Sequence, residues 1–587
     1  MTGIDASLLF TARCGAASFH SRSIRSLSIA LMLGAAAACT RLPQAATPAG
    51  SDVRITDPAQ KLARSPHGMV ASASPLATAA GARVLAQGGN AVDAAVATGF
   101  ALAVVEPVMS GLGGRTSIVL RTRDGEIFAV DGLNQVPRGY RANSGIPDAY
   151  ERAAIPGQPA ALLLVLERYG TMSRQQVMAP AIRYAEEGFA LTVDQAQFIA
   201  GAVEDLRGHP ASARYFLKPD GAAYRAGEHF IQRDLARTLR SVAEHGAAGF
   251  YSGWVADSIH ADMTRHGGFI TRDELAAYEA LPAIVVRGGY RGHEIVSAFR
   301  PASGHSVIQA LQMLETLAVP RDGGPEWAAL VGQAMHFAMQ DRGRSYGTET
   351  ESARVLTSRE HASERASQIV VPGPAAPLRA PIRVPSRVPV GVAAGYDFEE
   401  EPGALPWARP DRDNTTHLST ADRFGGVVAL TQSLGPGLGT RLAASGTGVI
   451  FATRLGAAPG SRPGSTIAPT LVLRDGRVRY VLGGAGDNRI ITAVTQSISR
   501  AIDQGLPLEQ AVAAPRVHPL GATQLRLEDG AWSPAAHARL QTLGFELSTG
   551  PGTYFGRVHA VATDPATGSF TGIAEPRGFG GAAAPVR

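Results

Sequence analysis

Apolar residues recur at helical spacing early in the chain and alternate with polar residues further on. Residues 75–87 predict a helix that ends at Gly88-Gly89, and 91–105 predict a second helix that is almost wholly apolar. A helix that is apolar on every side has to be buried, so we expect this second helix in the core. The turn Arg123-Asp-Gly125 lies between two strand patterns and predicts a hairpin.

Strand patterns return in the last third of the chain. Residues 427–433 alternate as a strand, the turn Asp475-Gly476 predicts a second hairpin, and residues 558–573 predict a final one. Between the two parts, residues 371–390 contain six prolines, which predicts a linker rather than a packed element. Strands on both sides of one linker are explained most simply by a sheet that both parts share.

The first 39 residues resemble a secretory signal. Arg22 and Arg25 precede an apolar run, 27–38, which is too short to span a bilayer. Small residues lead up to Cys39, as in a lipoprotein signal; ordinary cleavage close to Ala38 is the alternative. We therefore expect an exported protein that is periplasmic, or anchored to the cell envelope by a lipid at Cys39, with no other contact with the membrane.

Composition and charge exclude several other functions. The 587 residues carry a formal net charge of +5, and all 55 basic residues except Lys61 and Lys218 are arginine, with no basic run. Nucleic-acid binding is therefore not expected. Cys14 and Cys39 are the only cysteines and no His-Glu-x-x-His motif is found, so the sequence predicts neither a thiol nucleophile nor a metal site, and we expect no cofactor.

Thr415 opens a polar strand pattern soon after the proline-rich segment. A hydroxyl is a poor nucleophile without a base, but a threonine at a chain terminus carries its own base, an α-amine with a pKa of about 7.7–8. Thr415 can create this terminus itself, by attacking the carbonyl carbon of Asn414 and letting water hydrolyse the resulting ester. The alternative is that Thr415-Thr-His417 only begins a strand.

Further motifs stand in a fixed order along the chain. They are Gly68-Met-Val-Ala-Ser72, Gly88-Gly-Asn-Ala-Val-Asp-Ala-Ala95, Val105-Glu-Pro107, Ser110-Gly-Leu-Gly-Gly114, Ile155-Pro-Gly157, Gly249-Phe-Tyr-Ser-Gly253, Gly267-Gly-Phe-Ile-Thr271, Pro301-Ala-Ser-Gly304, Thr415-Thr-His417 with Ser419 and Asp422, Arg462-Pro-Gly-Ser465, Arg489-Ile-Ile-Thr492 and Ala514-Pro-Arg-Val-His518. Together they resemble the γ-glutamyltransferase family, also called γ-glutamyltranspeptidase or glutathione hydrolase, from about residue 64 to residue 580. Many matches in one order are far more specific than any single motif.

The resemblance implies an N-terminal-nucleophile fold of the α+β class. This fold is an αββα sandwich, in which two stacked antiparallel sheets are covered by helices. The resemblance also implies cleavage between Asn414 and Thr415 into two subunits that stay together. The implied parts are a signal (1–39), a large subunit (40–414) with a helical and sheet body (53–370) and a proline-rich linker to the cleavage site (371–414), and a small catalytic subunit (415–587).

The resemblance also assigns roles to single residues. Thr415 aligns with the nucleophile, and Ser433 with a hydroxyl residue that supports it. Gly486-Asp487 align with two glycines whose backbone N–H groups form the oxyanion hole, so Asp487 replaces the second glycine. Ser465-Thr466 align with a serine pair of the substrate pocket.

The residues that would recognise a γ-glutamyl group depart from the family. The family's carboxylate-binding arginine aligns with Leu133, and the residues that hold the ammonium group align with Gly435, Arg454 and Ala457. Arg115 and Arg454 are the remaining candidates for binding a substrate carboxylate, although such arginines more often have a structural role.

Three functions therefore stay open. The first is an exported, self-processing enzyme that cleaves γ-glutamyl amides such as glutathione through an acyl-enzyme and passes the acyl group to water or an amine. The second is an acylase for a different acyl group, as in the cephalosporin and glutaryl acylases. The third is a non-catalytic binding protein with the same fold, which the changed pocket residues favour and the intact Thr415-Thr-His417 opposes.

Overall fold

The computed structural model describes residues 54–370, 413–453 and 457–586. The predicted signal, residues 371–412 of the predicted linker and Arg454 lie outside these residues. The described residues all belong to one compact unit. Within the described part of this unit, no helix is long and apolar enough to cross a membrane.

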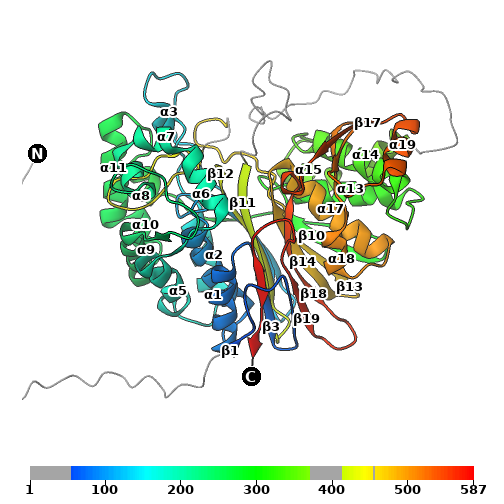
Figure 1. Ribbon diagram of the computed structural model, residues 1–587, viewed down its shortest axis with the longest axis horizontal. Helices are drawn as coiled ribbons and strands as arrows, with labels where there is room; N and C mark the ends of the chain where they lie inside the picture. The colour runs from blue at the N-terminus through cyan, green and yellow to red at the C-terminus, as the bar shows by residue number, and fades with distance from the viewer. Residues whose placement is uncertain (1–53, 371–412, 454–456, 587) are drawn as a thin grey trace, which may run out of the picture. The chain divides into compact units, whose positions relative to one another are not determined.

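Two seven-stranded antiparallel sheets lie at the centre of the described residues (Figure 1). In sheet order, the first consists of β20 (Gly581–Ala583), β3 (Gly68–Ser72), β11 (Asp413–Asp422), β12 (Val427–Pro436), β4 (Arg115–Arg121), β5 (Ile127–Gly132) and β8 (Leu281–Pro282). The second consists of β2 (Leu62–Ser65), β19 (Phe570–Ile573), β18 (Arg557–Thr563), β14 (Arg477–Ala485), β13 (Thr470–Arg474), β10 (His293–Ala298) and β9 (Val285–Tyr290). The three predicted hairpins are confirmed as β4–β5, β13–β14 and β18–β19.

Smaller pairings lie around the two large sheets. They are β1 (Arg54–Ile55) with β21 (Pro585–Val586), β6 (Phe189–Ala190) with β7 (His229–Phe230), and β15 (Val517–Gly521), β16 (Gln524–Glu528) and β17 (Glu546–Gly550) in one three-stranded sheet. The pair β1–β21 brings the first described residues to the last ones.

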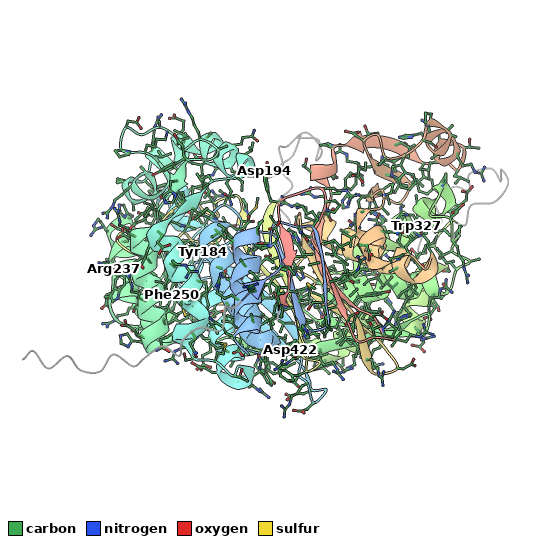
Figure 2. The ribbon with its side chains drawn as sticks, turned by 60° about the horizontal axis from the view of Figure 1, so that its bottom comes forward. Tyr184, Asp194, Arg237, Phe250, Trp327 and Asp422 are labelled. Carbon is green, nitrogen blue, oxygen red and sulfur yellow. The ribbon has the colours of Figure 1, made fainter. Side chains whose placement is uncertain are left out.

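Helices cover the outer face of each large sheet, and Figure 1 shows the two helical layers on opposite sides. The layer on the first sheet contains α1 (Pro75–Ala86), α2 (Ala91–Val105), α3 (Asp148–Glu151), α4 (Gln158–Tyr169), α5 (Arg174–Glu187), α6 (Val193–Gly201), α7 (Val203–Arg207), α8 (Pro210–Phe216), α9 (Arg233–His245), α10 (Ala248–Tyr251), α11 (Gly253–His266) and α12 (Arg272–Ala276). The layer on the second contains α13 (Gly304–Glu315), α14 (Pro325–Asp341), α15 (Glu349–Leu356), α16 (Arg359–Ala366), α17 (Asn488–Asp503), α18 (Leu508–Ala513) and α19 (Pro534–Thr542). The short 3-10 helix η1 (Gly552–Tyr554) follows β17. Phe250 and Trp327, both fully buried, mark the cores of the two layers in Figure 2. The predicted αββα sandwich is confirmed.

Strands from both sides of residues 371–412 form each sheet. In the first sheet, β11 lies between β3 and β12, with Leu418 opposite Ser72, and β12 pairs with β4. In the second, β10 pairs with β13. The predicted shared sheet is therefore confirmed. Backbone hydrogen bonds and side-chain burial across these pairs hold the two parts of the chain together.

Helix α2 fixes the position of strand β11. Asn90 and Asp93 form a capping box at its start, and all of its residues are buried, as its apolar pattern predicts. The hydroxyl of Thr420 donates a hydrogen bond of 2.7 Å to the carbonyl of Ala91, and the Asp422 carboxylate accepts one of 2.8 Å from the Ala91 N–H. Strand β11 is thus tied to a buried helix near the end opposite Thr415.

Candidate active site

Thr415 lies near the start of β11, at one edge of the space between the two sheets. Its hydroxyl donates a hydrogen bond of 3.2 Å to Oγ of Ser433, which lies directly opposite on β12. The Ser433 oxygen also accepts the N–H of Gly435 at 2.9 Å. Both side chains are buried, and the pairing of β11 with β12 is irregular between Asn414 and Thr415. The structure thus brings Thr415 and Ser433 together as the sequence predicts, beside the predicted cleavage site.

A column of polar side chains continues from Thr415 between the sheets. Residues two apart on a strand share a face, so His417 and Ser419 follow Thr415. Nδ1 of His417 lies 2.7 Å from the Thr431 hydroxyl, and Nε2 lies 3.1 Å from Oγ of Ser419. Because Ser419 donates its own proton to the carbonyl of His559, it accepts from Nε2, and Nδ1 accepts from Thr431.

The His417 side chain is neutral and links the hydroxyls of Thr431 and Ser419. Burial lowers its pKa to about 3, so the imidazole stays uncharged at neutral pH. On the facing sheet, a Cβ added to Gly483 would lie 2.6 Å from Nδ1 of His417, closer than atoms can approach. His417 was predicted only as part of the motif Thr415-Thr-His417; its spacing of two from Thr415 on a predicted strand was the signal for a shared face.

The end of β14 reaches the level of Thr415 from the second sheet. Gly483 faces His417, whereas Val481 shares a hydrophobic cluster with Ala421 further along β11, so β14 runs toward the Thr415 end of β11. There Gly486 has a φ of +122°, and Asp487 has φ +51° and ψ −130° immediately before α17. Neither backbone N–H donates a hydrogen bond to another described residue. Two N–H groups beside a nucleophile are the arrangement that stabilises an oxyanion.

The segment Ser465-Thr466 lies against this turn. The backbone N–H of Ser465 donates to the carbonyl of Pro301 at 2.7 Å, and the hydroxyl of Ser303 donates to the carbonyl of Ser465 at 2.6 Å. These bonds fix the segment so that the hydroxyl of Thr466 donates a hydrogen bond of 3.2 Å to the carboxylate of Asp487. The predicted pocket pair and the predicted oxyanion turn are therefore in direct contact.

Arg115 lies beside the nucleophile on the other side. It pairs with Ser433 across β4 and β12, it is buried, and its guanidinium lies 3.5 Å from the side-chain oxygen of Asn134. A Cβ on Gly435 would lie 2.8 Å from the Arg115 guanidinium, so glycine at this position leaves room for the arginine.

Leu133, which aligns with the family's carboxylate-binding arginine, is fully buried. The neighbouring Asp131 forms an ion pair of 3.0 Å with Arg462, so an acidic group there is already neutralised. Ala457 is buried as well, and Arg454 lies outside the described residues. Among the described candidates, Arg115 is thus the cation that the structure brings to Thr415.

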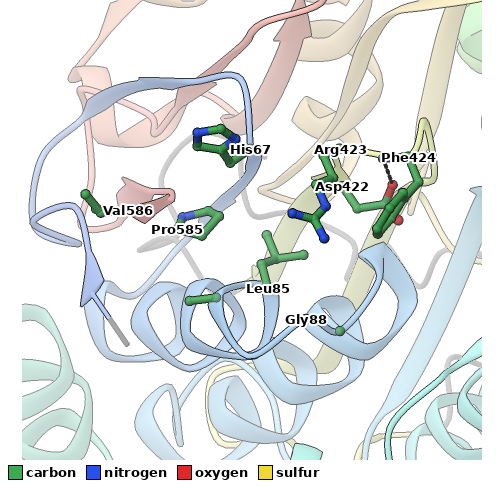
Figure 3. Close-up of a pocket in the computed structure, with 10 residues that line it drawn as sticks. His67, Leu85, Gly88, Asp422, Arg423, Phe424, Pro585 and Val586 are labelled. Carbon is green, nitrogen blue, oxygen red and sulfur yellow. Dashed lines mark hydrogen bonds between the residues drawn. The ribbon is translucent and has the colours of Figure 1, made fainter. Parts of the chain in front are cut away.

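A small cavity of about 130 Å³ lies elsewhere, between the turn after β11 and the last described residues (Figure 3). Asp422, on its wall, accepts the backbone N–H groups of Phe424 and Gly426 at 2.8 and 3.0 Å and thereby orders the turn. Asp422 lies seven positions along β11 from Thr415, a distance of about 23 Å. This cavity is therefore not part of the site.

Comparison with known proteins agrees with this geometry. The family model of Gamma-glutamyltranspeptidase matches residues 77–585. The chain belongs to this family. It is therefore an enzyme of the N-terminal-nucleophile hydrolase type, as the motifs predict.

The family members that are similar to this chain include proteins named glutathione hydrolase and proteins named acylase. A glutathione hydrolase proenzyme of Escherichia coli K12 is 31% identical over 558 residues, covering 88% of this chain and 91% of that protein. An acylase ACY 1 proenzyme of Pseudomonas sp. strain SE83 is 30% identical, covering 88% and 93%. The crystal structure of a cephalosporin acylase from Bacillus halodurans superposes with a TM-score of 0.77 at 26% identity, covering 89% of this chain and 97% of that one.

Proposed function

We propose that this protein is an exported, self-processing γ-glutamyl amide hydrolase and acyltransferase that acts on compounds such as glutathione. The observation that carries the proposal is the hydrogen bond between Thr415 and Ser433 beside the turn Gly486-Asp487. The hydrogen bond pairs the hydroxyl of the proposed nucleophile with a supporting hydroxyl, and β14 ends in the turn that offers two backbone N–H groups. The names of similar proteins, glutathione hydrolase proenzymes among them, support the same reading.

Self-processing is the first step of the proposed chemistry. The Thr415 hydroxyl oxygen attacks the carbonyl carbon of Asn414, and the C–N bond between these residues breaks as the acyl group moves to oxygen. Water then hydrolyses the ester, which frees the carboxyl group of Asn414 and the α-amine of Thr415. The small subunit, 415–587, would remain joined to the large one because β11 and β12 lie between β3 and β4.

Catalysis then uses the new terminus. The α-amine accepts the proton of the Thr415 hydroxyl as its oxygen attacks the substrate amide carbon, and it passes the proton to the leaving amine. Ser433 orients the attacking oxygen, and the N–H groups of Gly486 and Asp487 receive the oxyanion. Water or an amine resolves the ester. This scheme uses groups of the chain alone and requires no cofactor.

Arg115 is the residue that we assign to the substrate carboxylate. A guanidinium matches a carboxylate with two parallel hydrogen bonds, and Gly435 leaves it room beside Ser433. Arg115 would thus bind the carboxylate in place of the family's arginine, whose position Leu133 occupies here. Export, through the signal 1–39 and with or without a lipid at Cys39, is part of the proposal and rests on the sequence.

A second candidate is an acylase that takes an acyl group without an amine. The observation that favours it is the buried apolar Leu133, together with similarity to a cephalosporin acylase and to an acylase ACY 1 proenzyme. The two candidates differ in one chemical group. A γ-glutamyl amide carries an ammonium and a carboxylate, whereas a glutaryl amide carries the carboxylate alone.

Release of p-nitroaniline from γ-glutamyl and glutaryl p-nitroanilides distinguishes these functions. We expect kcat/KM to be about tenfold or more higher for the γ-glutamyl compound, since a charge-assisted hydrogen bond contributes about 1.5–3 kcal/mol. Faster release from the glutaryl compound would support the acylase. An uncut chain that releases p-nitroaniline from neither would support the binding protein.

A further inference from the structure

Asp487 occupies a backbone conformation that glycine normally takes. Its φ of +51° with ψ of −130° corresponds to the first central position of a type II′ turn, where a side chain is unfavourable. The residue keeps this conformation in a packed turn between β14 and α17. Strain of this kind is tolerated where the side chain has a use.

The Asp487 side chain does not serve to cap helix α17. Asp487 stands at the N-cap position of α17, where an aspartate commonly accepts a backbone N–H of the first turn, but its side chain makes no such bond. Instead its carboxylate accepts the hydroxyl of Thr466 at 3.2 Å. The side chain thus faces the segment Ser465-Thr466 rather than the helix.

Two arginines close to Asp487 in the fold form hydrogen bonds with the residues on either side of it. Arg489 directs Nε to the carbonyl of Gly486 at 3.0 Å, and its guanidinium lies 4.7 Å from the ring centre of Tyr554. Arg342 donates to the side chain of Asn488 at 3.1 Å. Among the described residues, the hydrogen-bond partner of the Asp487 carboxylate is the neutral Thr466 hydroxyl. Arg115, which pairs with Ser433 across β4 and β12, belongs to the opposite sheet.

We propose that Asp487 determines specificity by binding an ammonium group on the acyl part of the substrate. The inference rests on the proposed function and adds the residue that holds the ammonium group of the acyl part. Thr466 orients the carboxylate, and an ammonium supplies charge-assisted hydrogen bonds to it. A second carboxylate at this position is repelled, so a carboxylate of the substrate has to lie toward Arg115.

Four p-nitroanilides that differ only in charge test this assignment. The γ-glutamyl compound carries both groups, the 4-aminobutanoyl compound the ammonium alone, the glutaryl compound the carboxylate alone, and the butanoyl compound neither. For the natural protein we expect kcat/KM for 4-aminobutanoyl to exceed that for butanoyl about tenfold or more. In Asp487→Asn, which keeps the size of the side chain and an acceptor for Thr466, this ratio should fall about tenfold.

Two further variants make the test independent of folding. Asp487→Gly suits the positive φ, so it should fold at least as well and lose the same ratio. Asp475→Asn is the matched control, because Asp475 also has a positive φ, of 52°, and is exposed at the other end of β14. It should keep the ratio of the natural protein.

The outcomes separate this inference from the proposed function. If the natural protein cleaves the γ-glutamyl compound but both Asp487 variants keep the preference for 4-aminobutanoyl, the assignment of Asp487 is wrong and the function stands. The same conclusion follows if the natural protein shows no such preference. If it cleaves none of the four compounds, the proposed function is wrong and this assignment with it.

Discussion

Replacing Thr415 with alanine is expected to leave the chain in one piece and to lower amide hydrolysis by about 10⁴-fold or more. The variant lacks the oxygen that attacks Asn414, and without that cleavage no α-amine is available as a base. The Thr415 hydroxyl, which the variant lacks, also donates the 3.2 Å hydrogen bond to Ser433 that organises the site. Gel electrophoresis and p-nitroaniline release from the γ-glutamyl compound measure the two losses.

The neighbouring threonine provides a matched control. Thr416 is fully buried, and its hydroxyl has no hydrogen-bond partner among the described residues, so Thr416→Val should keep both cleavage and hydrolysis. Thr415→Ser should retain both in part, because it keeps a hydroxyl and a terminal amine. Full activity in Thr415→Ala would exclude Thr415 as the nucleophile.

Gly483→Ala is expected to lower the free energy of unfolding by about 1–3 kcal/mol and to slow self-cleavage. The added methyl group would lie 2.6 Å from Nδ1 of His417, and two hydrogen bonds hold that ring in place. Overpacking a buried interface carries a cost of this size. Displacement of His417 would also move Thr431 and, with it, the strand that holds Ser433. Urea denaturation measures the first effect, and the rate of fragment formation the second.

A double variant tests whether contact with the His417 imidazole causes the destabilisation by Gly483→Ala. His417→Ala removes the ring, so adding Gly483→Ala to it should have little further effect, a non-additivity expected for residues in contact. Gly201→Ala is the control, because no atom lies within 4 Å of the added carbon and helix α6 gains a better helix former. Equal losses from Gly483→Ala with and without His417 would contradict the proposed contact.

Periodic patterns predicted much of the fold. The apolar run 91–105 became α2, and the turns Arg123-Asp-Gly125 and Asp475-Gly476 became hairpins because local backbone chemistry determines such turns. The proline-rich segment led to the prediction of a shared sheet. The order of strands within each sheet did not follow from these patterns, since it depends on contacts between residues hundreds of positions apart.

Part of the candidate site could likewise be predicted from the sequence, and part could not. Thr415 and Ser433 were predicted as partners from the family resemblance, and they lie opposite each other. The contact of Thr466 with Asp487, the room that Gly435 leaves for Arg115 and the fit of Gly483 against His417 are long-range matches of shape and charge. No local pattern carries such information, so the structure was needed to find them.

The intact masses and N-terminal sequences of the purified protein show whether Thr415 becomes a chain terminus. We expect two fragments that stay together in solution, one of which begins Thr-Thr-His-Leu-Ser and corresponds to Thr415–Arg587. A single uncut chain that persists after long incubation, or a fragment that begins at any other residue, would contradict it.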